Sequence, residues 1–432
     1  MTKVRVLKLS LHNRLVGYLA GFDNGKNVLT FAQEFALDNN RPTLSLTTRP
    51  DFPFADRRLM EQWVHRQKIN PILSNLLPEG ALRLLLTQGL KIHPDNEFEL
   101  LAYLGRDLPG ALVVESIEPE AIPHYIFDIA NGRESATLLP TSDLLPIYAH
   151  FSLAGVQMKF SMTHQRGRFT LPNTAKNSDL GDWIIKTPSA VHQGVAENEY
   201  SMMRLAKMAG VDIPNIKLVD LEQLDNLPTL HLPNEPYAYA IERFDRDKVI
   251  ENHATMNVSR IHSEDFAQIL GKYPHDKYQG GNYNQIAQIL YQYSQDGLAD
   301  IKQLARRLLI NILLGNGDAH LKNWSVIYPD GFHLRLSPAY DIVFTKAYIA
   351  NETNLALNLG KRKNWYQIEL TDFEYWAKKA DIPWRVVKSE LAEMLSIART
   401  EWRNTLKNLP MLDNQKNLLL EHWRQLPSDF RI

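Results

Sequence analysis

The stretch IKQLARRLLINILL, residues 301–314, places the strongest constraint on how this chain folds. Its apolar residues recur at helical spacing and share one face, namely Ile301, Leu304, Ala305, Leu308, Leu309, Ile312 and Leu313. A stripe of this width predicts an amphipathic helix. The helix must therefore pack its apolar face inside a domain.

A short polar loop, GNGDAHLKN, follows that helix directly. It gathers an acid, an imidazole, an ammonium and an amide as Asp318, His320, Lys322 and Asn323. Asp318 and Asn323 have the spacing of the aspartate and asparagine in a protein-kinase catalytic loop, where the first orients the nucleophile and the second holds metal. Phosphoryl transfer is therefore one interpretation of this loop.

Other interpretations of the same four residues stay open at this point. Aspartate and asparagine beside glycines are common in turns and helix caps. Asp318 and His320 also have the chemistry of a transition-metal pair, although no other histidine stands at a partner spacing nearby. His320 is equally suited to ordering the loop through a hydrogen bond, and Lys322 to facing solvent.

Upstream segments supply further candidates in the order that a kinase requires. Lys186 ends the strand predicted for DWIIKTP, and the helix predicted for ENEYSMMRLAKMAG carries Glu197 and Glu199. This order is that of the strand lysine and helix glutamate of kinases. Glu242 and Phe244 follow a buried strand, at the place of a kinase hinge. The alternative for each is ordinary: a lysine leaving a sheet, or a phenylalanine in the core.

A glycine turn and an acid complete the series. SLAGVQMK places Gly155 among small residues, where backbone amides can cradle phosphates. Asp341 in SPAYDIV follows the hairpin predicted for WSVIYPDGFHLRLSP and is the candidate second metal carboxylate, or else a cap. The order favours a kinase. Because the loop lacks H-R-D and Asp341 is not followed by Phe-Gly, the chain is no ordinary eukaryotic-type protein kinase.

The composition limits the partners. Lysine plus arginine number 48 against 49 acidic residues, so there is no global basic field, and contact with nucleic acid needs a local patch or a partner. The chain has no cysteine, which excludes disulfides and thiolate metal sites. The N-terminal apolar run LVGYLAGF is too short to span a bilayer. We expect a cytoplasmic protein with no membrane partner.

These motifs together resemble the HipA-type toxin kinases of bacterial type II toxin-antitoxin modules. NLLPEG (75–80) and LLAYLGRDLPGAL (100–112) are similar to the family's N-terminal domain, and SLAGVQMK to its phosphate loop. ERFDR, EDFAQILG, GDAHLKN and SPAYDIV are similar to its kinase core. The resemblance covers nearly the whole chain.

The resemblance implies an α+β fold with a two-lobed, protein-kinase-like core related to lipid kinases. A small N-terminal α+β domain is expected over residues 1–112. Residues 113–240 would form the kinase N-lobe with a connecting segment and the phosphate loop. Residues 241–432 would form an all-helical C-terminal lobe with the catalytic loop and the metal site.

The resemblance also implies the residues of the site. The catalytic aspartate would be Asp318, and the cofactors would be ATP and Mg²⁺, with Asn323 and Asp341 as metal ligands. The implied ATP-binding residues are Ala154, Gly155, Val156, Gln157, Lys186, Glu242, Phe244, His320 and Lys322. Ser152 matches the serine that such kinases phosphorylate on themselves, with loss of activity, because a dianionic phosphate alters how the loop pairs with nearby cations.

The implied partner is a helix-turn-helix antitoxin of the HipB type, which binds operator DNA together with the toxin and represses their operon. A near-neutral toxin fits this role, since the antitoxin would make most phosphate contacts. The implied substrate is a protein, glutamyl-tRNA synthetase in the best-known members, whose modification arrests growth. Two alternatives stay open: a catalytically silent kinase fold that strengthens the antitoxin's hold on DNA, and a small-molecule or lipid-type kinase.

Overall fold

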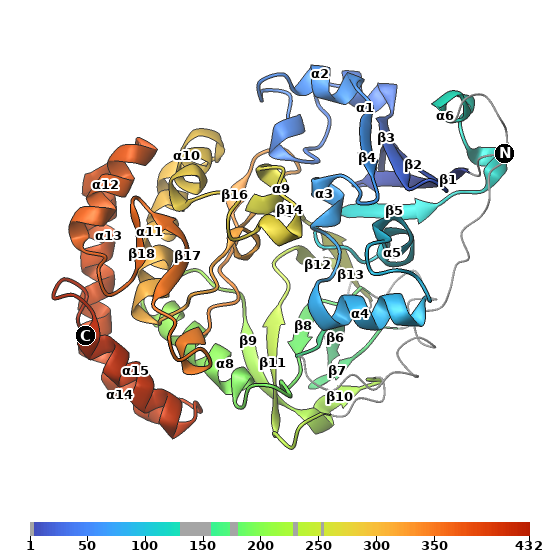
Figure 1. Ribbon diagram of the computed structural model, residues 1–432. Coiled ribbons are helices and arrows are strands. Elements are labelled where there is room, and N and C mark those ends of the chain that lie inside the picture. Colours follow the sequence, from blue (N-terminus) through green and yellow to red (C-terminus); the bar gives the residue numbers. More distant parts are fainter. Residues whose placement is uncertain (1–3, 130–156, 173–179, 228–231, 252–254) are drawn as a thin grey trace.

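The fold is that of a computed structural model, which describes residues 4–129, 157–172, 180–227, 232–251 and 255–432. It is a mixed α+β structure, as the sequence predicted (Figure 1). Across these ranges, no helix combines the length and the apolar character needed to cross a membrane.

The N-terminal region is an antiparallel sheet with helices packed beside it. Its strand order is β4-β3-β2-β1-β5. The strands are β1 Val4–Leu11, β2 Arg14–Phe22, β3 Lys26–Phe31, β4 Trp63–Arg66 and β5 Leu112–Ser116. The helices are α1 Gln33–Leu37, α2 Ala55–Met60, α3 Pro71–Ser74, α4 Gly80–Gly89, α5 Glu97–Leu104 and α6 His124–Ile129. Alternating apolar residues of VRVLKLSL bury Leu7, Leu9 and Leu11 in the core of this region.

The predicted boundary after residue 112 falls inside this sheet. β5 pairs with β1 as far as the Leu7–Ser116 contact, so the N-terminal sheet continues to Ser116. β11 likewise crosses the predicted boundary at residues 240 and 241. The division into 1–112, 113–240 and 241–432 therefore stays a prediction, and the strands run a few residues past its limits.

A second sheet, of order β10-β7-β6-β8-β11-β9, forms the smaller kinase-like lobe. Its strands are β6 Lys159–Gln165, β7 Arg168–Thr170, β8 Trp183–Lys186, β9 Ile216–Asp220, β10 Leu224–Asp225 and β11 Tyr237–Glu242. The long helix α8, Val195–Met208, packs against β9 and β11 and buries Met202, Leu205 and Ala206. It ends where Gly210 takes a positive φ of 77°, as the sequence predicted.

The C-terminal lobe is built around the helix that the apolar stripe predicted. That helix is α11, Gly297–Leu313, and its apolar stripe is fully buried. The other helices are α9 Phe266–Ile269, α10 Tyr283–Tyr293, α12 Leu370–Ala380, α13 Trp384–Ile397, α14 Arg403–Asn408 and α15 Asp413–Gln425. Helices α12 to α15 lie on the side of the molecule away from the N-terminal sheet (Figure 1).

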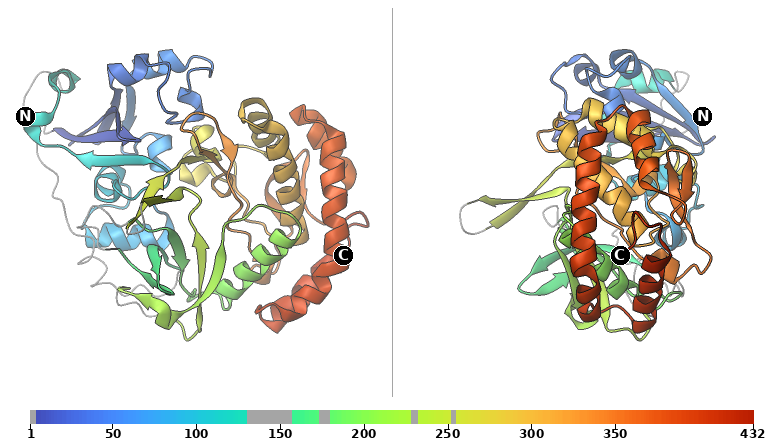
Figure 2. Two further views of the ribbon diagram at one scale, coloured as in Figure 1. Left: turned by 180° about the vertical axis from the view of Figure 1, so that it is seen from behind. Right: turned by 90° about the vertical axis from the view of Figure 1, so that its left-hand side faces the viewer.

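The expectation that this lobe is all-helical needs a correction, because small sheets accompany the helices. β14 His262–Asp265, β15 Ser325–Tyr328 and β16 Arg335–Leu336 pair in one, and β17 Asn354–Leu359 and β18 Arg362–Asn364 in another. The PDG turn folds β15 back onto β16, which is the hairpin that the sequence predicted. A further hairpin, β12 Arg246–Glu251 with β13 Thr255–Arg260, projects from the body in Figure 2.

The N-terminal region is fastened to the C-terminal lobe by buried hydrogen bonds. Leu46 N donates to Glu264 Oε1 at 2.7 Å, and Asn75 Nδ2 donates to Lys272 O at 2.7 Å. Asp245 accepts from Gly110 N at 2.7 Å. The three structural regions therefore form one body, and a cavity lies where they meet.

Candidate active site

A buried cluster of ion pairs surrounds Lys186, the last residue of β8. Its Nζ lies 2.6 Å from Glu199 Oε1 on α8 and also contacts Asp341 Oδ1. Lys159, on the neighbouring strand β6, approaches Asp341 Oδ2 at 3.4 Å. The sequence offered Glu197 and Glu199 as partners of the strand lysine, and the contact is made by Glu199. The fold thus brings together Lys186 of β8, Glu199 of α8 and Asp341, which follows the β15–β16 hairpin.

Charge pairing favours the ionised forms of Lys186 and Asp341 in this cluster. Burial acts to lower the pKa of Lys186, but Asp341 and Glu199 outweigh it and raise that pKa above its ordinary value. Burial acts to raise the pKa of Asp341, but Lys159 and Lys186 hold it well below the usual range. Burial does raise the pKa of Glu199, against the pull of Lys186. A lysine that stays protonated is suited to contact phosphate oxygens.

The polar loop after α11 is ordered by its own hydrogen bonds. His320 N and Asn323 Nδ2 both donate to the backbone oxygen of Asp318, each at 2.8 Å. Tyr278 OH donates to Asp318 Oδ1 at 2.5 Å. Asn316 Oδ1 accepts from Asp318 N at 3.1 Å. The loop therefore presents the Asp318 carboxylate from a fixed backbone. Asn323 uses its amide nitrogen to bind that backbone, so its amide oxygen stays available as a metal ligand.

His320 lies behind this carboxylate and is buried. Its ring meets the ring of Tyr278 edge-on at 5.0 Å. Burial lowers the pKa of His320, although Asp318 acts to raise it. Within the described part of the chain, its Nδ1 atom is buried without a hydrogen-bond partner. The lowered pKa favours the neutral imidazole, and its Nδ1 atom is withdrawn from solvent in this arrangement.

Glu242 and Phe244 lie where β11 leaves the sheet, as a hinge requires. Asn215 makes two hydrogen bonds with Glu242: its side-chain Nδ2 donates to Glu242 Oε2 at 2.6 Å, and its backbone oxygen accepts from Glu242 N at 2.9 Å. The Phe244 ring lies 5.6 Å from the Tyr340 ring, which precedes Asp341. These aromatic rings form an apolar wall beside the charged cluster.

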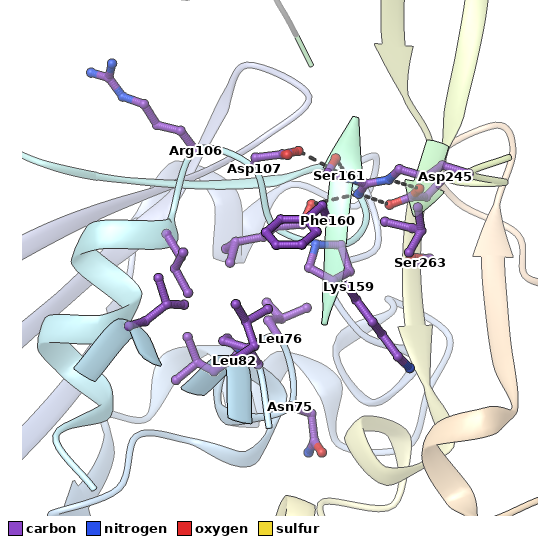
Figure 3. A pocket seen from close by; sticks show the side chains of 18 of the residues that line it. Asn75, Leu76, Leu82, Arg106, Asp107, Lys159, Phe160, Ser161, Asp245 and Ser263 are labelled. Atoms are coloured by element: carbon purple, nitrogen blue, oxygen red, sulfur yellow. Dashed lines mark hydrogen bonds and ion pairs between the residues drawn. The ribbon is translucent and has the colours of Figure 1, made fainter. Parts of the chain in front are cut away.

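A cavity of about 920 Å³ connects these features. Lys186, Glu242, Phe244, Lys322 and Asp341 line it, together with Lys159 and with apolar side chains of the N-terminal region. Figure 3 shows Lys159 extending from β6 into this space, with Leu76 and Leu82 on the N-terminal side. Its volume lies in the range of small-molecule and cofactor sites. Among the described residues, Asp318, His320 and Asn323 lie on the loop beside this lining and are not part of it.

Lys322 is held by the N-terminal region, although the sequence left open a phosphate contact or exposure to solvent. Its Nζ lies 2.8 Å from Glu79 Oε1 and 3.0 Å from the backbone oxygen of Asn75. Both partners belong to the NLLPEG motif. The catalytic loop and the N-terminal region therefore meet at this lysine.

Part of the predicted site lies outside the described residues. This applies to Ser152, Ala154, Gly155 and Val156. Gln157 is described, just before β6, and its amide nitrogen is buried without a partner in the described portion of the structure. The phosphate-loop assignment and the autophosphorylation site stay predictions.

The donor set suits magnesium. Asn323 offers an amide oxygen and Asp341 a carboxylate, and Mg²⁺ prefers oxygen ligands from one or two protein groups together with phosphates and water. In the part of the chain that is described, no cluster of three or more histidine, aspartate or glutamate side chains is placed to hold a metal on its own. The residues therefore fit an ion that arrives with a phosphorylated ligand. Among the described residues, no third ligand joins Asp318 and His320, so the structure does not support a transition-metal site there.

Three contacts in this site had no signal in the sequence. Lys159 reaches Asp341 across 182 positions, Tyr278 reaches Asp318 across 40, and Glu79 reaches Lys322 across 243. Lys159 stood at the end of SLAGVQMK and Glu79 in NLLPEG, two segments already singled out, but neither residue was assigned a contact. Only the tertiary structure shows that Tyr278 contacts Asp318 and that Glu79 contacts Lys322.

Comparison with protein families places the chain. Residues 7–115 match the HipA N-terminal domain, and residues 151–402 match the HipA-like C-terminal domain. The second match alone covers more than half of the chain. The chain belongs to the HipA family.

Relatives of this HipA family member align over almost its whole length. Y4dM of Sinorhizobium fredii, provisionally named a kinase, is 37% identical over 95% of this chain and 94% of its own. The serine/threonine-protein kinase toxin HipA of Shewanella oneidensis is 24% identical over 98% of this chain and 95% of its own. The family assignment thus agrees with the resemblance seen in the motifs.

A solved structure shares the fold. It belongs to the complex of the Shewanella oneidensis MR-1 toxin-antitoxin system HipA, HipB and its operator DNA. The match has a TM-score of 0.69 at 21% identity and covers 97% of both chains. This HipA family member therefore has the HipA fold with its kinase-like core.

Proposed function

We propose that this chain is an ATP- and magnesium-dependent serine/threonine protein kinase and the toxin of a type II toxin-antitoxin pair. One observation carries the proposal: Lys186 is paired with both Glu199 and Asp341, and Asn316, in the loop that presents Asp318, donates from Nδ2 to Asp341 O at 3.5 Å. A lysine paired with a helix glutamate and a metal aspartate next to a loop carboxylate is the arrangement that phosphoryl transfer requires. The family membership and the names of the relatives support it.

In this proposal the side chains divide the reaction among them. Asp318 orients the acceptor hydroxyl and takes its proton as the new oxygen–phosphorus bond forms and the bond to ADP breaks. Lys186 neutralises phosphate charge, and Glu242 and Phe244 hold the adenine. Asn323 and Asp341 hold magnesium, which supplies charge neutralisation on the phosphates when bound.

Two further ATP contacts complete the proposed set. His320 is proposed as a nucleotide contact because it lies on the same loop as Asp318, and Lys322 because it lines the cavity together with Lys186 and Asp341. The phosphate-loop residues Ala154, Gly155, Val156 and Gln157 are proposed to cover the phosphates. Lys159, which the sequence did not single out, joins them because it already contacts Asp341.

The biological part of the proposal rests on the family. We propose that the chain phosphorylates itself on Ser152 and modifies a component of translation, with glutamyl-tRNA synthetase as the first substrate to test. We also propose a HipB-like helix-turn-helix antitoxin as partner, and operator DNA bound mainly through it. A solved relative comes from a complex of HipA, HipB and operator DNA, which supports this assignment.

Intact-mass analysis of the purified chain after incubation with ATP and magnesium tests the kinase assignment. We expect one added phosphate on the wild type and none on Asp318→Ala or Ser152→Ala. Ser152→Ala should still phosphorylate a true substrate, whereas Asp318→Ala should phosphorylate nothing. Absence of any added phosphate, from starting protein shown to be unmodified, would favour the silent repressor partner. Phosphate that persists in Asp318→Ala would contradict the catalytic role.

A further inference from the structure

Glu79 lies in the turn before α4, and its side chain does not cap that helix. The next residue, Gly80, has a φ of +59°, a conformation that glycine adopts far more readily than other residues. The turn therefore directs the carboxylate of Glu79 away from α4.

The two carboxylate oxygens of Glu79 bind two lysines of the kinase core. Oε1 lies 2.8 Å from Lys322 Nζ, and Oε2 lies 2.9 Å from Lys277 Nζ. Although burial acts to raise it, these two lysines lower the pKa of Glu79 below its ordinary value. Lys322 is also bound by Asn75 O, so both of these Lys322 partners belong to the N-terminal region. These side chains are largely withdrawn from water, which makes the pairs stronger than exposed ones.

Both lysines are connected directly to the catalytic loop. Lys322 precedes Asn323, whose amide nitrogen binds the backbone of Asp318. The backbone oxygen of Lys277 accepts from Leu321 N at 3.2 Å. Glu79 therefore restrains the loop from two sides through two lysines.

The residue after Lys277 extends this connection to the reacting end of the loop. Tyr278 OH donates to Asp318 Oδ1 at 2.5 Å, so a shift of residues 277–278 moves a hydrogen bond on the catalytic carboxylate itself. In phosphoryl transfer, small errors in the placement of the acceptor carboxylate cost large factors in rate. A carboxylate supplied by the N-terminal region is thus two contacts away from Asp318.

We propose that Glu79 is a positioning residue for the catalytic loop, through which the N-terminal region holds Lys322, Lys277 and, beyond them, Asp318 in place. This inference rests on the proposed kinase function for its effect on rate. The order of the loop itself can be measured without phosphate transfer. If Glu79 only docks the N-terminal region, its loss should loosen that region and leave the order of the catalytic loop unchanged.

Hydrogen exchange on the full chain, followed by mass spectrometry, distinguishes the two roles. With Glu79→Gln we expect the exchange of a peptide spanning 316–324 to rise about tenfold, because a charge-assisted bond is lost. A peptide spanning 44–48 should keep its rate, since Leu46 N is bound to Glu264 and not to Glu79. Loop exchange that stays unchanged, or a rise confined to 44–48, would overturn the proposal.

The matched control is Glu61→Gln. Glu61 also lies in the N-terminal region and pairs with Arg57 at 2.9 Å, but both side chains are exposed and that pair does not involve the catalytic loop. We expect neither peptide to change. Glu79→Asp is the second variant: it keeps the charge but is shorter by one methylene and cannot reach both lysines, so its loop should exchange at an intermediate rate. A wild-type rate in Glu79→Asp together with one in Glu79→Gln would overturn the proposal.

The rate of phosphate transfer gives a second readout. Glu79→Gln should lower kcat about tenfold, because the catalytic carboxylate is less well placed. In a chain carrying both Lys277→Met and Lys322→Met, Glu79→Gln should change kcat less than twofold further. A further tenfold loss there would contradict action through these lysines. If the wild type transfers no phosphate while loop exchange still rises, the kinase assignment fails and the positioning role stands.

Discussion

Two buried clusters of charge lie a short distance apart in this molecule, and they are organised differently. In the first, between the N-terminal region and the kinase core, Asp107 and Asp245 face Arg243 and Arg246. Asp245 accepts from Arg243 at 2.8 and 2.9 Å, from Arg246 at 2.9 Å and from Gly110 N at 2.7 Å. Two acids meet two arginines, and Asp245 is almost wholly withdrawn from water. We call these four residues the interdomain network.

The second cluster is that of Lys186, Glu199, Asp341 and Lys159. Lys186 and Glu199 are as buried as Arg243, Arg246 and Asp245, and Asp341 at 24% exposed resembles Asp107 at 28%. The clusters differ at Lys159, which is 48% exposed. The lysines are point charges that can turn toward a new partner, whereas the arginines are fixed in planar, bidentate contacts. Residues of both clusters line the same cavity. Similar numbers of charges thus build a contact fixed by arginines in one place and one with an accessible, exchangeable lysine in the other. The difference separates a cluster that holds the fold from one that can bind phosphate.

Breaking the interdomain network should have the largest effect on stability. We expect Asp245→Ala to cost about 3 to 5 kcal/mol of unfolding free energy, because it leaves two buried arginines with one acid between them. Chemical denaturation measures this. Asp247→Ala, two residues further on and exposed, is the control and should change stability by less than about 0.5 kcal/mol. A loss for Asp245→Ala no larger than that of the control would show that the network is not structural.

A smaller, pH-dependent effect should come from Glu264, which lies at the same boundary and has no salt-bridge partner among the described residues. Its Oε1 accepts from Leu46 N and from Tyr328 OH, and burial raises its pKa to about 7. A carboxyl whose pKa is higher in the folded state than the ordinary 4.5 binds its proton more tightly there, so its contribution to stability is complete below about pH 4.5 and is lost as the pH rises toward 7.

Glu264→Gln should remove that dependence. Relative to the wild type, the variant should gain stability between pH 5 and pH 8, by about 1 to 3 kcal/mol. Parallel denaturation curves at the two pH values measure the difference and cancel contributions from other groups such as His262 and Asp265. If Glu264→Gln and the wild type differ in stability by the same amount at both pH values, Glu264 is ionised throughout this range. The burial of Glu264 would then not make the stability depend on pH.

The sequence predicted the elements of the site better than their contacts. Helical periodicity located α8 and α11, and the PDG turn located the β15–β16 hairpin, because each is encoded within one short stretch. The family resemblance and the α+β, kinase-like fold are confirmed by the comparisons. The roles of Asp318, Asn323 and Asp341 stay predictions, now supported by their placement around Lys186 and the loop.

What the sequence could not predict depends on residues far apart in the chain. The choice of Glu199 over Glu197 depends on which face of α8 turns toward β8, and both residues sit near the start of that helix. Lys322 pairs with Glu79 across 243 positions, so no local pattern could distinguish a phosphate lysine from a loop restraint. β14 was missed because it pairs with a strand some 60 residues away, so the predicted hairpin could not be recognised as part of a larger sheet.

Isothermal titration of ATP into the chain, with and without magnesium, tests the central claim most directly, because it needs no acceptor. The cluster around Lys186 is assigned to nucleotide and metal, so the wild type should bind ATP more tightly with magnesium, and Asp341→Asn should lose that gain while keeping the Lys186–Glu199 pair. Asp247→Asn should behave as the wild type. No binding by the wild type, or the same magnesium-dependent affinity in Asp341→Asn, would contradict the account.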